Sequence, residues 1–358
     1  MSQPMATACE MRAWRTHAYG QPLEALKLDV VPIPDPGPGE LRVKVQAIPL
    51  NLNDLERITG GNMMVRPELP YSPGMEVMGM VDACGEGTEQ WAGRRVVAIP
   101  TGAYGGFAEY AICPVPSVFE MPESIPLPDA AALYFPFHLA WLGLIDRAEL
   151  KEGQTVLIHA AAGGSGSAAV QLALDRGARV FTTAGTDEKV RFCQELGAHV
   201  AMNYNTSDFA EIVLRETDNQ GVDVVFDNVG EAVMEKSLQC TKYNGLYLMM
   251  GFASNKSVAD EQFLVPRRIA LGNLKMCGVL LAYQEPSALS FLKTGMGWNF
   301  PPAELGARIM DEIISLVRSK RVKPIVGRVV DFEEIPSAID ALARRETIGR
   351  TIAVITEP

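Results

Sequence analysis

The first third of the chain alternates apolar and polar positions over short stretches, the period expected of half-buried β-strands. The clearest run, residues 41–48 (LRVKVQAI), follows a segment rich in Pro and Gly. Comparable runs occur at residues 74–84, 93–100 and 105–113, with turn-forming Gly or Pro between them. This pattern predicts a mostly β domain over residues 1–137.

From residue 138 onward, short apolar runs alternate with amphipathic stretches of about 10 to 13 residues. The predicted strands are residues 155–158, 178–185, 199–204, 222–230 and 246–252, and the predicted helices are residues 167–177, 186–197, 208–218 and 233–245. Regular alternation of strand and helix is typical of a parallel, doubly wound sheet. Residues 138–283 are therefore expected to form a Rossmann-type dinucleotide-binding domain, so that the whole chain is an α/β protein.

This alternation stops after residue 283. Residues 304–322 have the spacing of an amphipathic helix, and residues 324–355 follow as strand, helix and strand. These pieces do not extend a parallel sheet easily. We therefore expect residues 284–358 to return to the first domain and complete it.

Composition narrows the classes of function. The chain has 358 residues and a formal net charge of -11, which argues against a nucleic-acid surface because phosphate neutralisation needs clustered Lys and Arg. Its apolar runs are far shorter than the roughly 20 residues that span a bilayer, and no secretory signal is visible. The six cysteines form no C-x-x-C pair, as expected of reduced cytosolic thiols. We expect a soluble, cytoplasmic protein that binds neither nucleic acid nor membrane.

Residues 159–169 (HAAAGGSGSAA) follow the predicted strand 155–158 and lead into a predicted helix, the place of a phosphate-binding turn. The three positions of the G-x-G-x-x-G fingerprint are Ala161, Gly163 and Gly166. Ala is acceptable at the first position if its φ is negative. The second position lets backbone amides approach a pyrophosphate, and the third lets the helix pack on the strand. Small residues also pack tightly without a ligand, but the repeating strand–helix context favours a dinucleotide.

The end of the second strand of this domain selects between cofactors, because a carboxylate there binds the ribose 2′-hydroxyl of NADH. Residues 184–186 (AGT) occupy that place and bring no carboxylate. Thr186 offers a hydroxyl and Lys189 a charge to a 2′-phosphate, so the sequence favours NADPH. The acidic residues 187–188 weigh against this, although a helix N-terminus attracts acids for structural reasons. In the alternative interpretation, Lys189 is only a solvated helix residue.

Together these segments resemble the medium-chain dehydrogenase/reductase superfamily, specifically its zinc-independent quinone oxidoreductase branch, which includes zeta-crystallin. The resemblance covers nearly the whole chain, and its markers are PGPGELRVKVQA, NLNDLERITG, LPYSPGMEVMGMV, GGFAEYA, VLIHAAAGGSGSAAVQLA, TAGTDEK, LGAHVAMNY and VDVVFDNVG. It implies a GroES-like β fold for the first domain, which carries the substrate side, and NADPH binding by the second.

The resemblance also implies cofactor contacts, residue by residue. Those at the pyrophosphate are Ala162, Gly163, Gly164, Ser165 and Gly166, those at the adenosine phosphate are Gly185, Thr186 and Lys189, and Tyr204 lies near the adenosine. Further positions that approach the cofactor are Asn228, Gly251, Phe252, Ala253 and Arg350. Tyr204 and Asn228 also have structural explanations, as a strand cap and as a hydrogen-bond partner of the following turn.

Zinc-dependent members of the superfamily hold their catalytic metal with a Cys, the His of a G-H-E triplet, and a later Cys or Asp. This chain has Asn51-Leu52-Asn53 in the first of these segments, and Met75 stands in the triplet where the His would be. Met and Asn do not form a tetrahedral zinc site. We therefore expect no metal, and hydride transfer from NADPH to a quinone or an activated double bond rather than alcohol oxidation.

That reaction needs a hydrogen-bond donor at the oxygen where negative charge develops. By resemblance, Asn51 and Asp54 belong to the segment that faces the nicotinamide, and His138 and Tyr104 are further candidates. In the alternative interpretation, His138 is packed between aromatic residues and Asp54 caps a short helix.

The leading hypothesis is an NADPH-dependent reductase of quinones or α,β-unsaturated carbonyls. An enoyl-thioester reductase shares the architecture and would need a basic patch for the carrier phosphates, for which only Arg267 and Arg268 are well placed. A low-turnover, crystallin-like NADPH-binding protein is a third hypothesis, because Glu56 stands where many relatives carry Tyr, and Leu139 where many carry Thr. By resemblance, residues 274–282 form an edge strand through which a homodimer or homotetramer assembles.

Overall fold

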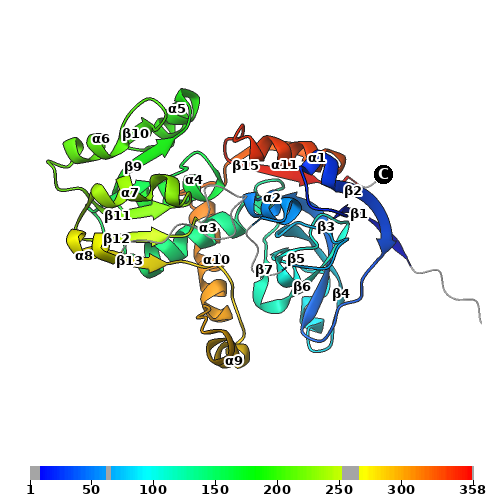
Figure 1. Cartoon of the computed structure of the whole chain (residues 1–358). Coiled ribbons are helices and arrows are strands. Elements are labelled where there is room, and N and C mark those ends of the chain that lie inside the picture. The colour runs from blue at the N-terminus through cyan, green and yellow to red at the C-terminus, as the bar shows by residue number, and fades with distance from the viewer. Residues whose placement is uncertain (1–8, 62–65, 252–265, 357–358) are drawn as a thin grey trace, which may run out of the picture. The chain divides into compact units, whose positions relative to one another are not determined.

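The computed structural model describes residues 9–61, 66–251 and 266–356, and the chain forms two compact units (Figure 1). The first unit comprises Met1–Ala131, Arg328–Glu346 and Thr351–Pro358, and the second comprises Ala132–Gly327 and Thr347–Arg350. None of the helices in these described ranges is both long enough and apolar enough to cross a membrane.

The first unit consists mostly of β-strands, as its alternating pattern predicts, and its pairs β1-β2, β3-β4, β3-β6, β3-β15, β4-β5 and β5-β7 are antiparallel. Its main sheet has the order β14-β15-β3-β4-β5-β7, with β6 also paired to β3, and β1 pairs with β2 in a separate ribbon. The bounds are β1 (Glu10–Thr16), β2 (Leu26–Pro32), β3 (Glu40–Pro49), β4 (Val77–Cys84), β5 (Arg95–Ala98), β6 (Tyr110–Pro114), β7 (Val118–Glu120), β14 (Val326–Asp331) and β15 (Arg350–Val354). Its α-helices are α1 (Pro22–Ala25), α2 (Leu52–Thr59) and α11 (Ile335–Ala343). Along β3, Leu41, Val43 and Val45 are buried in the core, which accounts for the apolar half of the alternation.

The second unit contains a six-stranded sheet in which every pairing is parallel, with the order β10-β9-β8-β11-β12-β13. Its strands are β8 (Thr155–Ile158), β9 (Arg179–Ala184), β10 (Val200–Asn203), β11 (Val222–Asp227), β12 (Thr241–Met249) and β13 (Lys275–Gly278). Its α-helices are α3 (Tyr134–Trp141), α4 (Gly164–Asp175), α5 (Asp187–Glu195), α6 (Phe209–Glu216), α7 (Glu231–Gln239), α8 (Pro266–Gly272), α9 (Pro286–Met296) and α10 (Ala303–Arg318). The α/β class and the doubly wound parallel sheet are confirmed, and β13 is the last strand in this order.

One predicted helix is too long. The pattern predicts a helix over residues 233–245, whereas α7 ends at Gln239 and β12 begins at Thr241. Thr241 pairs with Val222 of β11, and the register then shifts before the next pair. Pairing with a neighbouring strand therefore overrides the local helical spacing in this segment.

The division into units also differs from the expected one. The segment from residue 284 was expected to return to the first domain, but the first unit resumes only at Arg328. The reason is that the end of α10 is held to α4 by specific bonds. Gln171 donates from Nε2 to the Lys323 carbonyl at 2.9 Å and accepts from the Lys323 N–H at 2.9 Å, and Arg321 pairs with Asp175 at 2.6 Å.

Candidate functional site

The glycine-rich turn lies between β8 and α4. Its left-handed residue is Ala160, with φ 50°, and Ala161 is not among the described residues with positive φ. The Gly163 N–H donates to the Ala160 carbonyl at 3.0 Å, and the Ser167 N–H donates to the Gly163 carbonyl at 2.9 Å. The tight turn is therefore made one residue before the fingerprint position, and Ala161 meets the condition under which Ala is acceptable there.

The three glycines of this turn are required for different reasons. A Cβ on Gly166 would lie 2.2 Å from the Ala160 carbonyl oxygen, so this glycine lets α4 pack against the turn. A Cβ on Gly164 would lie 2.5 Å from Cδ of Arg350. Gly163 has φ -83°, and its added Cβ would meet its nearest described neighbour, the Ala160 oxygen, only at 3.4 Å. Packing within the protein therefore explains Gly164 and Gly166, and it does not explain Gly163.

Arg350 reaches this turn although it lies near the end of the chain. The Gly349 N–H donates to the Ala162 carbonyl at 2.7 Å, and Gly163 and Gly349 form an isolated parallel bridge. The Arg350 N–H donates to the Ile325 carbonyl at 2.8 Å, and the residue is 5% exposed. The structure thus brings together Ala162, Gly163 and Arg350. Ser165 lies in the first turn of α4 and is half-buried.

A buried histidine, for which the sequence pattern predicts no role, fixes the start of this turn through contacts of both ring nitrogens. His159 Nδ1 lies 2.8 Å from Thr183 Oγ1, and its Nε2 lies 2.8 Å from Ser237 Oγ. Burial lowers the pKa of His159 to about 3, so the ring is neutral and donates from one nitrogen while accepting at the other. This residue ties the turn to β9 and α7, and the signal was a lone polar residue at the end of an apolar run.

Gly185, which follows β9, and Tyr204, which follows β10, lie close together. A Cβ on Gly185 would lie 2.6 Å from Tyr204 Oη, so a larger residue here would displace the Tyr204 ring. Asn205, which the sequence analysis did not single out, donates from Nδ2 to the Gly185 carbonyl at 2.7 Å. The Tyr204 N–H donates to the Ala184 carbonyl at 3.1 Å. The loops after β9 and β10 are therefore joined at this point.

The first turn of α5 follows immediately. Thr186 is the N-cap, and its Oγ1 accepts from the Lys189 N–H at 3.3 Å. A hydroxyl can donate one bond while it accepts another, so the Thr186 O–H can donate to a ligand. The Asp187 carboxylate, which weighed against NADPH in the sequence, accepts from Asn203 Nδ2 at 2.7 Å. An exposed Thr hydroxyl and the half-buried Lys189 therefore share one helix end.

The ends of β11 and β12 meet at Asn228. The Nδ2 atom of Asn228 is buried and has no hydrogen-bond partner among the residues that the structure describes. A Cβ on Gly251 would lie 2.1 Å from the Asn228 carbonyl carbon, so these two strand ends touch through their backbones. A buried amide donor without an acceptor is unfavourable, and a bound acceptor would satisfy it. The expected contacts Phe252 and Ala253 lie outside the described residues.

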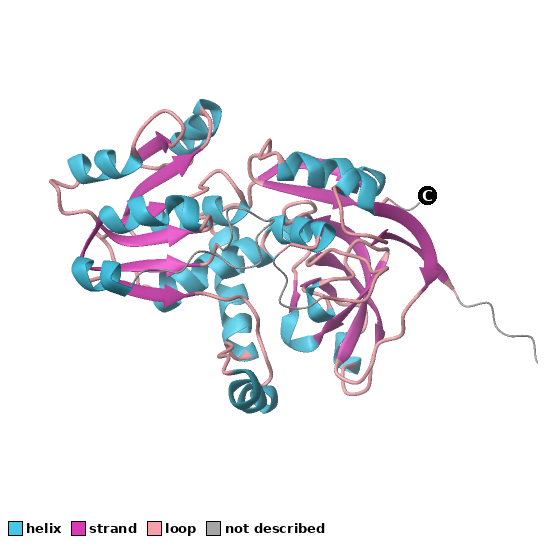
Figure 2. Cartoon of the chain, viewed as in Figure 1, coloured by secondary structure: helices cyan, strands magenta, loops and turns pink. Residues whose placement is uncertain are grey.

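These groups share one edge of the sheet. Every strand is parallel, so the residues that follow β8, β9, β10, β11 and β12 all emerge at its carboxyl edge, where Figure 2 shows the arrowheads on one side. Strand β8 has β9, the next strand along the chain, on one side and β11 on the other, so the strand order reverses at β8. Ligands bind in such sheets at the carboxyl ends of the strands, where the order reverses. Gly163 and Asn228 follow the two strands at this reversal.

In the first unit, the candidates Asn51 and Asp54 are both buried, and both make bonds within the fold. Asp54 accepts from the Asn51 N–H at Oδ2 and from the Met75 N–H at Oδ1, each at 2.9 Å. Asn51 Nδ2 donates to the Pro49 carbonyl at 3.1 Å and to Glu76 Oε2 at 3.3 Å. Asp54 thus caps α2 and also fixes the backbone at Met75.

By resemblance, Asn51 and Met75 stand in the segments that hold catalytic zinc in zinc-dependent members, and their chemistry does not fit a metal. The Asn51 amide nitrogen donates to Glu76, and neither an amide nor the Met75 thioether is a ligand of tetrahedral zinc. Within residues 9–61, 66–251 and 266–356, no group of three or more His, Cys, Asp or Glu side chains is arranged to hold a metal ion.

The third candidate, His138, lies in α3 and is fully buried. Its Nδ1 is 2.8 Å from Tyr283 Oη, and its ring makes edge contacts with Tyr134 and Tyr283. Burial lowers the pKa of His138 to about 3 and raises the pKa of Tyr283. This environment is that of a histidine packed between aromatic residues.

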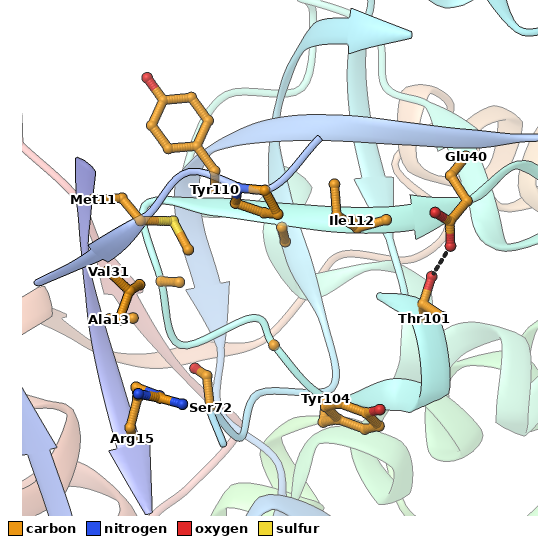
Figure 3. A pocket seen from close by; sticks show the side chains of 14 residues that line it. Met11, Ala13, Arg15, Val31, Glu40, Ser72, Thr101, Tyr104, Tyr110 and Ile112 are labelled. Atoms are coloured by element: carbon orange, nitrogen blue, oxygen red, sulfur yellow. Dashed lines mark hydrogen bonds between the residues drawn. The ribbon is translucent and has the colours of Figure 1, made fainter. Parts of the chain in front are cut away.

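Tyr104 lies elsewhere in the first unit. It lines a largely apolar cavity of about 380 Å³, together with residues of β1, β2 and β6 such as Met11, Val31 and Ile112. Figure 3 shows a hydrogen bond of 2.8 Å from Thr101 to Glu40 beside this cavity. Neither Asn51 nor Asp54 is among its described lining residues, so the structure does not group Tyr104 with them.

The expected basic pair at the start of α8 is partly engaged. Arg268 Nε pairs with Glu235 Oε1 of α7 at 2.8 Å, and Arg267 is exposed. One of the two charges is therefore already balanced by a neighbouring carboxylate.

Two protein families match this chain. Residues 37–123 match the alcohol dehydrogenase GroES-like domain, and residues 164–294 match the zinc-binding dehydrogenase domain. The first match lies in the β unit and the second in the unit with the parallel sheet.

Individual proteins match nearly the whole chain. A quinone oxidoreductase from Sus scrofa is 34% identical over 314 residues, covering 85% of this chain and 94% of that protein. A mycobacterial protein solved in complex with NADPH has 29% identity and a TM-score of 0.81, covering 96% of this chain and 99% of that one. The JamJ enoyl reductase in its apo form has 27% identity and a TM-score of 0.82, covering 97% of this chain and 99% of that one.

Proposed function

Because the chain belongs to the quinone oxidoreductase branch of the medium-chain dehydrogenase/reductase superfamily, we propose that it is an NADPH-dependent reductase of quinones or α,β-unsaturated carbonyls that works without zinc. The similar pig protein is a quinone oxidoreductase, and the similar mycobacterial protein binds NADPH. The first similarity supports a quinone as the acceptor, and the second supports NADPH as the cofactor.

The observation that carries the proposal is the open backbone at Gly163. A methyl group there would meet no described atom closer than 3.4 Å, in contrast to Gly164 and Gly166. A glycine without a packing reason, at the N-cap of α4, fits the close approach of a pyrophosphate to backbone N–H groups. The buried Asn228 Nδ2, at the adjacent strand end, fits a second acceptor on the same ligand.

The preference for NADPH rests on the first turn of α5. A 2′-phosphate would accept from the Thr186 hydroxyl and pair with the Lys189 ammonium group. Asp187 is engaged by Asn203, which lowers its effect as a competing carboxylate. Tyr204 and Gly185 would hold the adenosine beside this turn.

When bound, NADPH would supply the hydride, and the protein would position the acceptor for it. Hydride addition to a quinone leaves a quinolate oxygen that must take up one proton to give the hydroquinone. Asn51 and Asp54 are assigned a positioning role here, because their polar atoms bond Pro49, Glu76 and the backbone of α2 and Met75. His138 is neutral at neutral pH because burial lowers its pKa to about 3, so the proton comes from solvent in this proposal.

The test is a fluorescence titration of the purified protein with NADPH and NADH, followed by NADPH oxidation with 1,4-benzoquinone, 9,10-phenanthrenequinone and crotonyl-CoA. Binding of NADPH at least about tenfold tighter than NADH, with quinone turnover, is the expected result. Preference for the thioester would move the chain to the enoyl reductases. Tight binding with no turnover of any acceptor would favour the low-turnover crystallin-like role, and no binding of either cofactor would overturn the proposal.

The proposal includes a homodimer or homotetramer formed through β13. This strand ends the sheet order in the described residues, and an edge strand offers backbone donors and acceptors to a second copy. Light scattering after size exclusion measures the mass directly, and a monomer at working concentration would contradict this part of the proposal.

A further inference from the structure

A buried carboxylate lies next to residues 228–230, the Asn228 turn. Asp227, the last residue of β11, is 1% exposed. Its Oδ1 accepts from the Val229 N–H at 2.6 Å and from the Gly230 N–H at 3.0 Å, and its Oδ2 accepts from the Tyr247 hydroxyl of β12. One carboxylate therefore ties the next strand to the two residues that follow Asn228.

The backbone around this carboxylate leaves the turn little freedom. The Asp227 carbonyl accepts from the Gly251 N–H at 2.8 Å and from the Met250 N–H at 3.2 Å. Gly230 has φ 104°, a conformation that suits only glycine, and a Cβ on Gly251 would collide with the Asn228 backbone. The direction of the Asn228 side chain is thus set by a small number of bonds, three of which end on the Asp227 carboxylate.

We propose that Asp227 and Tyr247 form an ionisable positioning pair that holds the Asn228 turn in its cofactor-binding shape only while the carboxylate is charged. This inference rests on the proposed function, since it concerns the binding of NADPH at the same sheet edge. An ionised carboxylate accepts all three bonds, and those bonds are charge-assisted. A protonated Asp227 carboxyl group accepts the two amide bonds more weakly. Its own O–H then points toward Tyr247 Oη, which must accept a hydrogen bond instead of donating one.

Burial and the nearby charged groups set the pH at which the Asp227 carboxyl group loses its charge. Burial raises the pKa of Asp227 to about 6, against the opposing effect of the bonds from Tyr247, Val229 and Gly230. The nearby Glu231, in the first turn of α7, also raises this pKa. Directly after the neighbouring strand β8 lies His159, which is neutral and bonded to Thr183 and Ser237. NADPH affinity is therefore expected to fall as the pH drops through about 6.

The 2′-phosphate of NADPH titrates in the same range, because the second pKa of a phosphate monoester is about 6. A single pH profile does not separate the two groups. Comparison of variants separates them, because the 2′-phosphate makes the same contribution to the pH dependence of the Kd in every variant.

The experiment measures the Kd of NADPH by fluorescence from about pH 5 to about pH 8 for the wild-type protein, Asp227→Asn and Tyr247→Phe. Asp227→Asn keeps an acceptor for both amides and removes the titration, so its profile is expected to retain only the phosphate contribution. Tyr247→Phe removes a donor that lowers the Asp227 pKa, so the midpoint is expected to move to higher pH. Asp223→Asn is the matched control, because Asp223 lies at the opposite end of β11 from Asp227 and accepts hydrogen bonds from Thr155 of β8.

Wild-type and Asp227→Asn profiles that superimpose, or an unmoved midpoint in Tyr247→Phe, would overturn the pair while leaving NADPH binding intact. If Asp227→Asn does not fold, the midpoint of Tyr247→Phe decides alone. Failure of the wild-type protein to bind NADPH at any pH would remove the proposed function, and with it this inference. A merely structural role predicts lower thermal stability in both variants without any shift of the pH profile.

Discussion

Replacing Gly163 by Ala separates a glycine kept for a ligand from a glycine kept for packing. The change adds one methyl group at φ -83°, where Ala is unstrained, and the nearest described atom would lie 3.4 Å away. Loss of a favourable N-cap residue and the stiffer unfolded chain act in opposite directions, each by about 0.5–1 kcal/mol. The melting temperature is therefore expected to change by no more than about 2 °C.

Cofactor affinity is expected to respond quite differently. A methyl group between the turn and a pyrophosphate forces an overpacked contact, which costs about 1–3 kcal/mol. The Kd of NADPH is then expected to rise by roughly 5-fold to 150-fold, since about 1.4 kcal/mol is tenfold. Fluorescence titration gives the Kd, and differential scanning fluorimetry without cofactor gives the stability.

Two further variants make the result decisive. Gly166→Ala places its Cβ 2.2 Å from a backbone oxygen and is expected to lower the melting temperature by several degrees in the absence of any ligand. Gly295→Ala, in α9, meets no described atom within 4 Å and is expected to leave NADPH binding unchanged. If Gly163→Ala binds NADPH as tightly as the wild-type protein, the assignment of this turn to the pyrophosphate is wrong.

Three other outcomes are expected. Lys189→Ala should weaken NADPH binding by about 10-fold to 150-fold and leave NADH binding nearly unchanged, because a charged hydrogen bond to the 2′-phosphate contributes about 1.5–3 kcal/mol. Equal losses for both cofactors would contradict this. Burial lowers the pKa of His159 and of His138 to about 3, so below about pH 6.5 the unfolded chain binds protons that the folded chain does not. The free energy of unfolding should therefore fall as the pH drops from about 6.5 toward about 3, by up to about 1.4 kcal/mol per pH unit for each histidine. The raised pKa of Asp227 acts in the opposite direction between its ordinary value and about 6, and urea unfolding of His159→Gln across this range should show a shallower loss than the wild-type protein. Ala160→Gly should raise stability by about 0.5–1 kcal/mol by relieving the left-handed backbone, whereas the neighbouring Ala161→Gly should not, and thermal melts of the two variants compare them directly.

Local patterns determined most of the fold. A period of two in residues 41–48 predicted β3, and the alternation after residue 138 predicted the parallel sheet, because burial of one face imposes its period on the sequence. Because the sheet is parallel, Gly163, Thr186 and Asn228 emerge at one edge of it. These inferences need only backbone geometry and the position of each residue along the chain.

Contacts between distant segments decided the rest. The sequence shows three similar glycines, and only the structure shows that Arg350 covers Gly164 while Gly163 stays open. It likewise shows that α10 is held to α4, so the chain returns to the first unit later than its pattern indicates.

The roles of individual polar residues also depended on tertiary structure. Asp54 and His138 are candidate site residues in the sequence and Asp227 is not, yet all three owe their behaviour to partners on other segments or to burial. The sequence by itself determined the elements, the sheet edge and the cofactor class to expect there. Tertiary structure decided which groups on that edge are already bonded, because a side-chain hydrogen bond or a covered backbone leaves no periodic trace in the chain.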